Sequence, residues 1–538
     1  MVGDLLLNCT GGTPTPAGQP IPPVNIQIFL NTAVTSKILS GAFTESLLLL
    51  DDPGANNPVN PAQSLCLAAT GVCTSTGNGA GFGYYAGGGG NNPNIFQGQL
   101  VGTNSLLWLG VPIDPPGSNR TRIIRITNVR ANANALGVAG PNASPIPIIQ
   151  TISASGTFSV PINNPNQTVA FIQQGLKFSV STAAIGGVTP KTILQQCFSQ
   201  TNVLVGTLIY DELFATAFKK FNVGSSFAAP TNPVAQNNYS PSLNTETGFY
   251  NPNLGGSLNA NAAGLPTAGT RLKAVFNNVP AGVTLRVSQD AISNGADLAR
   301  AVANEVGPYV AASASSSLVT VALSGGSGMA VWEVLEADPF AFAKLSMNVY
   351  VSYTANPGAN SPALGTATVN GSYAPISTVT TASSTAPIPR FADTSVASNL
   401  FTINPCVTNL LFPFVTNQAG FDTGLAISNT STDPFGTSPQ TGSCDLYAYG
   451  ANAPASITTP TVASGTTFTA LASIAMPNFQ GYVIATCRFQ YAHGFAFVSD
   501  LGARELAMGY LALVIPDPAR AASPFPLAGA GSGEQLGN

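Results

Sequence analysis

The residue types that could support catalysis are few and scattered along this chain of 538 residues. A serine or cysteine nucleophile would have to use the one histidine, His493, whose apolar surroundings (YAHGFAF) predict a structural role. Glycosidase chemistry needs two carboxylates across one site. Three candidate pairs exist, each expected to be solvated or to cap a turn or helix: Asp51 with Asp52, Asp211 with Glu212, and Glu333 with Glu336. The sequence predicts no enzyme, no catalytic residue and no cofactor.

Metal-binding patterns are equally scarce. The sequence holds no C-x-x-C pair and no EF-hand loop, so no metal site is predicted. Calcium held by Asp51, Asp52 and backbone carbonyls remains the alternative.

The seven cysteines point to disulfide chemistry instead. Cys66 and Cys73 enclose a short loop and are candidates for a local bridge, whereas Cys444 and Cys487 lie in two expected strands of one domain. Three cysteines are left unpaired or bonded between chains: Cys9, Cys197 and Cys406. Buried free thiols in a reducing compartment are the alternative.

Charge is the most unusual property of the composition. The chain carries 18 Lys and Arg and 22 Asp and Glu, so 7% of its residues are charged, against about 25% in an ordinary soluble protein. A net charge of −4 without a basic tract argues against nucleic-acid binding. The longest apolar runs, at 47–50 and 506–515, are too short to span a membrane. Disorder is excluded by 28 Phe and 14 Tyr.

Short strand signals separated by Gly, Pro and Asn clusters dominate the sequence and favour an all-β fold. We expect tandem β-sandwich domains, similar to immunoglobulin or fibronectin-III domains, with one short connecting helix. That helix is predicted over 208–221, where Ile209, Leu213, Ala217 and Phe221 recur at four-residue spacing.

Composition shifts divide the chain further. The predicted segments are an N-terminal β domain (1–205) with a Gly-rich excursion (55–94), the helix with an Asn/Pro/Gly-rich connector (206–270), a fibronectin-like sandwich (271–377), a linker (378–398), an Ig-like sandwich of seven strands (399–517) and a tail (518–538). Trp332 is the expected buried aromatic residue of the second sandwich.

Asn-x-Ser/Thr sequons are consistent with an exported, glycosylated chain. The candidate acceptors are Asn8, Asn119, Asn142, Asn166, Asn238, Asn370 and Asn429.

Two stretches, covering well under half of the chain, carry a resemblance. CTGGTPTPAGQPIPPVNIQIFLNTAVTSKIL near the N-terminus and CVTNLLFPFVTNQAGFDTGLAISNTS with GYVIATCRFQYAHGFAFVSDLGARELAMGYLALVI near the C-terminus resemble large uncharacterised secreted β-rich proteins of environmental, Acidobacteria-type bacteria. The resemblance implies export and an extracellular or cell-surface setting, and it transfers no activity. Such relatives would begin with a signal peptide. We therefore expect that a leader has been removed or that Met1 is not the native start.

Charge depletion suggests a secreted structural protein that binds copies of itself in a filament or surface layer. The candidate contacts are the N-terminal arm through Pro23, the Gly-rich excursion, the C-terminal tail and a donor strand made of Val24, Ile26, Ile28 and Leu30. The alternative is a monomeric adhesin or carbohydrate-binding protein, with Tyr84 and Tyr85 as sugar-stacking candidates. A β-sandwich hydrolase is the third hypothesis.

Overall fold

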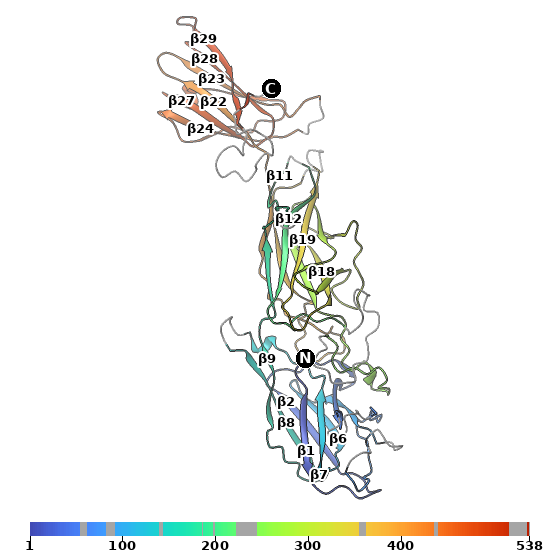
Figure 1. Cartoon of the computed structure of the whole chain (residues 1–538). Helices are drawn as coiled ribbons and strands as arrows, with labels where there is room; N and C mark the ends of the chain where they lie inside the picture. Colours follow the sequence, from blue (N-terminus) through green and yellow to red (C-terminus); the bar gives the residue numbers. More distant parts are fainter. Residues whose placement is uncertain are drawn as a thin grey trace.

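The computed structural model describes residues 1–53, 62–81, 85, 92–138, 144–184, 187–196, 199–221, 245–354, 362–434, 439–515 and 535–536. Within these residues, helix is limited to the single turn α1 (Ala472–Ala475) and two 3-10 turns, η1 (Asn134–Leu136) and η2 (Ala260–Ala262). The strands form three units that lie end to end (Figure 1). The expected tandem all-β fold is confirmed.

The N-terminal unit is one antiparallel sheet that curls until its two ends meet. Gly3 N–H, just before the first strand, donates a hydrogen bond of 2.8 Å to Val169 O in the last strand of the sheet. The spatial order is β1 (Leu5–Gly11), β7 (Gly117–Thr127), β4 (Phe43–Leu50), β5 (Ile95–Leu100), β6 (Ser105–Pro112), β2 (Pro23–Leu30), β8 (Ile146–Gly156) and β9 (Asn166–Ile172), with β3 (Ile38–Ser40) paired to β4.

Strand β4 is buried on both faces, which explains its unbroken run of four leucines. Leu48 and Leu50 point into the core of the N-terminal unit. Leu47 and Leu49 pack on the other side against Phe249 and neighbours from residues 249–263. The expected connector is therefore partly a packed layer over the first unit.

The middle unit is a sandwich of two sheets. One sheet has the order β10 (Leu176–Ser181), β12 (Gln200–Glu212), β19 (Lys344–Tyr353), β14 (Thr284–Ser288) and β17 (Leu318–Thr320), with β15 (Ile292–Ser293) paired to β19. The other has β11 (Ile193–Gln195), β21 (Ser398–Asn404), β20 (Gly365–Ala374), β13 (Arg271–Asn277), β18 (Gly328–Glu336) and β16 (Leu298–Val302). Trp332 is fully buried between them, and its indole N–H donates to Ser288 O at 3.0 Å.

The helix predicted over 208–221 is wrong. Residues up to Glu212 continue strand β12, which pairs with β10 on one side and β19 on the other. Leu208 and Tyr210 alternate into the core, and the Tyr210 hydroxyl donates to Lys273 O at 2.9 Å. This segment is therefore a strand and not a helix, although its apolar residues also recur every four positions. Its backbone N–H and C=O groups form hydrogen bonds with β10 on one edge and β19 on the other.

The C-terminal unit is also a sandwich, as expected, but its sheets have six and four strands among the described residues, where seven strands in all were expected. One sheet has the order β25 (Ile457–Thr458), β24 (Cys444–Ala451), β27 (Gln480–Cys487), β22 (Thr408–Thr416), β30 (Leu513–Ile515) and β31 (Gln535–Leu536). The facing sheet has β26 (Thr467–Leu471), β23 (Asp422–Asn429), β28 (Ala492–Ser499) and β29 (Ala507–Leu511).

The sheets place two domain boundaries away from the predicted ones. Strands β10 and β12 pair with the middle unit, although the N-terminal domain was expected to continue to residue 205. Strand β21 pairs with β20, so the third unit begins after residue 404 and not at 399. Both differences arise from pairings between segments far apart in sequence, which local patterns do not encode.

A buried ion pair fixes one side of the middle unit. The Arg271 guanidinium lies 2.8 Å from the Glu333 carboxylate, and both side chains are almost completely buried. Arg271 also donates to the carbonyls of Asn304, Glu305 and Gly307, which ties the loop that follows β16 to β13. Burial raises the pKa of Glu333, and the guanidinium opposes that shift.

Replacing Arg271 with methionine should therefore leave a buried carboxylate without its partner. We expect Arg271→Met to lower the free energy of unfolding by about 3–5 kcal/mol, measured by urea denaturation. The matched control is Lys344→Met, because Lys344 is half exposed and lies 3.8 Å from Asp211. This control should cost less than about 1 kcal/mol, and equal small losses in both variants would contradict the account.

Candidate interaction surfaces

The carboxylate pairs considered for catalysis are each engaged separately. Asp51 lies 3.2 Å from Arg122, and burial raises its pKa. Asp52 is fully buried and accepts a hydrogen bond of 2.6 Å from the Gln63 amide. Its other oxygen has no hydrogen-bond partner among the described residues.

The other two pairs are also divided between structural contacts. Glu212 accepts hydrogen bonds of 2.8 Å from the backbone N–H groups of Phe218 and Ala343, whereas Asp211 faces Lys344. Glu333 binds Arg271, and Glu336 lies 3.0 Å from Lys220. Within the described residues, no group of three or more His, Cys, Asp or Glu is placed to hold a metal ion, at Asp51 and Asp52 or elsewhere. His493 lies in strand β28 opposite Ser428.

Two pairs of cysteines form disulfide bonds, each within one unit. Cys66–Cys73 closes a loop beside the N-terminal sheet, and Cys444–Cys487 joins β24 to β27 within one sheet. Cys406 is disulfide-bonded as well, which corrects its assignment as unpaired or intermolecular. Cys9 is a free, partly buried thiol on β1 whose pKa is raised by burial. Cys197 lies outside the described residues.

The glycosylation candidates differ in access. Asn8, Asn119 and Asn166 are exposed and Asn370 is half-buried. Asn429 is buried, and its amide nitrogen donates to Gln440 O and Val462 O, so the expectation that it accepts a glycan is wrong. Asn142 and Asn238 lie outside the described residues.

The expected donor strand is not free. Strand β2 lies in the middle of its own sheet, paired to β6 on one side and β8 on the other. Its Val24, Ile26, Ile28 and Leu30 are buried in the core of the N-terminal unit. Because both edges are paired within the chain, the expectation that this strand joins a neighbour's sheet is wrong.

The N-terminal arm and part of the Gly-rich excursion bind each other. Ile21 N–H donates to Ser75 O, and Gly77 N–H donates to Gln19 O, both at 2.9 Å. Residues 54–61, 82–84 and 86–91 of this region lie outside the described residues, as do 518–534 and 537–538 of the tail.

The two tyrosines expected to bind sugars give no exposed aromatic site. Tyr85 is buried, its hydroxyl donates to Pro112 O at 2.5 Å, and the Arg122 guanidinium lies 4.6 Å from its ring centre. The assignment of Tyr85 to a sugar site is therefore wrong. Tyr84 lies outside the described residues.

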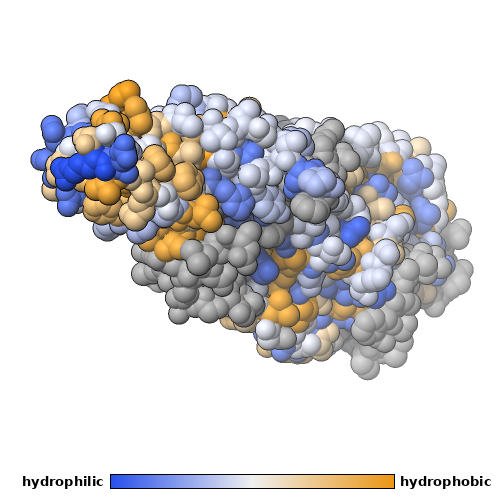
Figure 2. All heavy atoms as spheres, turned by 90° about the horizontal axis from the view of Figure 1, so that it is seen from above, coloured by the Kyte–Doolittle hydropathy of each residue, from blue (hydrophilic) through white to orange (hydrophobic). Residues whose placement is uncertain are grey.

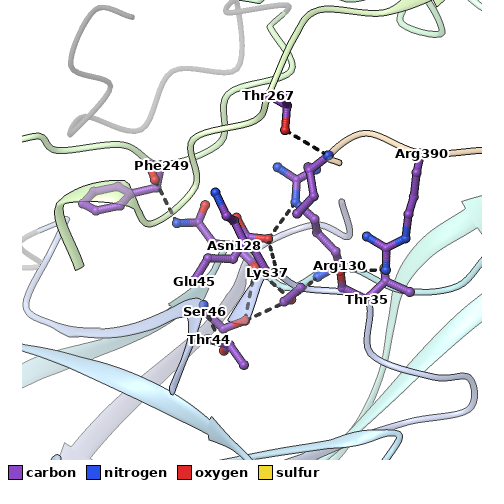
Figure 3. A network of polar contacts seen from close by, with 12 residues as sticks. Thr35, Lys37, Thr44, Glu45, Ser46, Asn128, Arg130, Phe249, Thr267 and Arg390 are labelled. Carbon is purple, nitrogen blue, oxygen red and sulfur yellow. Dashed lines mark hydrogen bonds and ion pairs between the residues drawn. The ribbon is translucent and has the colours of Figure 1, made fainter. Parts of the chain in front are cut away.

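A polar network joins the N-terminal and middle units (Figure 3). Glu45 Oε1 accepts hydrogen bonds from Arg130 Nε at 2.9 Å and from the backbone N–H of Lys37 at 2.8 Å. Asn128 donates across the junction to Phe249 O at 2.8 Å. Arg390 reaches Thr35 O from the segment expected to be a linker, so that segment is docked on the first unit.

In the C-terminal sheet that contains β28, large apolar side chains face outward and small side chains face the core, the reverse of the usual arrangement. In strand β28 the small residues Ala492, Gly494 and Ala496 point into the core, whereas Phe495 and Phe497 point outward and are 42% and 46% exposed. A Cβ atom at Gly494 would come within 2.6 Å of the Phe412 ring, so the core side accepts nothing larger. Strand alternation shows that two faces differ and does not show which one is covered.

Beside these phenylalanines runs a groove of about 540 Å³ along β23. Gly424 and Ala426 form its floor, with Phe495 and Phe497 on one side and Leu471 and Ile474 on the other. Strands β26, β23, β28 and β29 contain one Asp, Glu, Lys or Arg, namely Asp422, and it is buried. Figure 2 views the molecule from above, from the side of the C-terminal unit, and shows apolar side chains on its surface.

The opposite sheet of the same unit carries exposed tyrosines. Tyr449 and Tyr482 stack with ring centres 5.1 Å apart, and Tyr447 lies on the same face of β24. These residues were not identified from the sequence, although the alternation in YAYG holds the signal.

Comparisons with known proteins give no family. No family model and no curated protein matches the chain. Among solved structures, the backbone pilin T6 of serotype M6 Streptococcus pyogenes aligns over 95% of this chain and 80% of its own, at 8% identity and a TM-score of 0.18. A marsupial T cell receptor aligns over 95% and 98%, at 9% identity and a TM-score of 0.12.

The disulfides and the β-rich fold fit an extracellular or surface protein, because disulfides persist in oxidising compartments. Among the described residues, none of the helices has the length and apolarity that crossing a bilayer requires.

The buried Asp52 makes a pH-dependent prediction. Burial raises its pKa, so the folded protein favours the protonated form. Such a group stabilises the fold below its unfolded pKa of about 3.9, and this contribution is lost as the pH rises through the folded value. Asp52→Asn keeps an oxygen for Gln63 and carries no charge.

We therefore expect this variant to match the wild type in unfolding free energy at about pH 3 and to exceed it at pH 7. Urea titrations at both pH values measure the difference. A variant that is less stable than the wild type at pH 7 would show that the ionised carboxylate is required.

Proposed function

We propose that this protein is an extracellular structural protein that associates with copies of itself. The observation that carries the proposal is strand β28, which places Phe495 and Phe497 in solvent and its small residues in the core. Complete burial of a phenylalanine is worth about 1.5–3 kcal/mol, and these two side chains, 42% and 46% exposed, forgo part of it. An extended uncharged surface of this kind is typical of a face that another molecule covers.

The distribution of charge supports the same proposal. At least nine of the 18 Lys and Arg side chains lie in ion pairs within the described residues, and several of these pairs are buried. Few charges are left to keep copies of the chain apart. A sparsely charged exterior therefore favours close contact between copies, in a filament, sheet or sheath.

A second candidate function has its own observation. Tyr447, Tyr449 and Tyr482 form an exposed aromatic group on the other sheet of the C-terminal unit. Exposed aromatic rings that carry a hydroxyl group suit sugar binding, as expected of an adhesin. We keep glycan binding as the alternative.

The test is the size of the native protein over a range of concentrations. We expect sedimentation velocity to show species heavier than the 54.6 kDa chain that grow with concentration, and negative-stain electron microscopy to show ordered filaments or sheets. Repeating both after reduction identifies any contact that needs a disulfide between chains. Dispersed particles of one chain's mass at every concentration would contradict self-association, and their retention by a glycan array would favour the adhesin.

A further inference from the structure

Two phenylalanines at the tip of a short loop are the two most exposed aromatic side chains of the middle unit among its described residues. The loop connects β18 to β19 over residues 337–343, and Phe340 and Phe342 in it are 85% and 63% exposed. We call this pair the knob. An ordinary surface loop carries polar residues at such positions, so the knob is a candidate site of contact with another molecule.

The loop is held in place by side chains from other elements. Glu212 accepts the N–H of Ala343, and Asp297 accepts the N–H of Asp338, each at 2.8 Å, and both carboxylates are buried. Asn294 accepts the N–H of Lys344 at 2.9 Å. Because the loop is ordered before it binds anything, a partner pays little conformational entropy to contact the knob.

The groove on the C-terminal unit is concave and is also lined by apolar side chains. Its floor of Gly424 and Ala426 leaves about 540 Å³ open between two apolar walls, and Thr469 is the single polar side chain among its lining residues. A sugar would find few hydrogen-bond partners there, whereas aromatic side chains need none. Neither the two phenylalanines of the knob nor the lining of the groove includes a charged side chain, so contact between them would bury no charge.

The knob cannot fill the groove of its own chain. Strand β19 starts beside the knob at Lys344 and ends at Tyr353, whose hydroxyl binds Gln195 O in β11. Its ten residues span roughly 30 Å. The C-terminal unit is attached beyond this far end, where β11 pairs with β21 (Figure 1).

We infer that the knob of one copy inserts into the groove of the next copy. This inference rests on the proposed self-association and specifies its contact. The two surfaces differ and lie on different units, so the contact is heterologous, and repeating it produces an open chain of copies unless the rotation closes a ring.

The experiment uses two variants of the full chain that each remove one half of the contact. Phe340→Ser with Phe342→Ser removes the knob, and Gly424→Gln blocks the groove. A Cβ atom at Gly424 meets no heavy atom closer than 3.9 Å, so the glutamine fits without disturbing the sheet. The controls are Val396→Ser and Leu501→Ser, which remove exposed apolar residues elsewhere on the same two units.

We expect each half-contact variant to raise the concentration needed for assembly by at least about 100-fold, with both controls close to the wild type. Unfolding midpoints equal to that of the wild type would show that the variants are folded. Mixed in equal amounts, the two variants retain one intact knob and one intact groove. They should form a 1:1 complex of two chains and grow no further.

Several outcomes would overturn the inference. If the wild type assembles and both variants assemble equally well, the contact lies elsewhere and the proposed function stands. If Gly424→Gln blocks assembly and the knob variant assembles like the wild type, the groove binds something other than the knob and the inference fails. If the wild type does not assemble, the proposed function and the inference both fail.

Discussion

The burial of a few ion pairs in a chain with little charge is the constraint on which the rest of this structure depends. Glu45 with Arg130 and Arg271 with Glu333 are buried, and Arg122 is buried beside Asp51. Each pair ties a loop or a neighbouring unit to a sheet, and the loss of one partner would leave a charge in a low-dielectric interior. The pairs therefore specify how segments meet, and the charge on the exterior is sparse.

This arrangement connects the fold to the proposed function. The junction of the first two units is fixed by hydrogen bonds and by a layer of residues packed over β4. A fixed junction holds exposed surfaces at constant positions along the molecule, which a repeating contact between copies requires. The knob loop and the groove are both formed by described residues whose neighbours are well packed, and their exposure is a property of the native fold.

Much of the fold could be predicted from the sequence, because alternation and turn residues are local signals. The strands of the C-terminal unit and the bridges Cys66–Cys73 and Cys444–Cys487 follow from such signals. The helix over 208–221 was mispredicted because Leu208 and Tyr210 also fit a two-residue period. The free donor strand was mispredicted because pairing partners are distant in sequence. The outward phenylalanines of β28 were missed because alternation does not identify the covered face.

The salt dependence of association tests the central claim most directly. Contacts between uncharged surfaces are not screened by ions, whereas charge-driven contacts weaken as the Debye length shortens. Sedimentation equilibrium of the native protein from about 0.05 to 1 M sodium chloride should give an association constant that stays level or rises. A fall of about tenfold or more over that range would show that charged groups drive the association and would contradict the account.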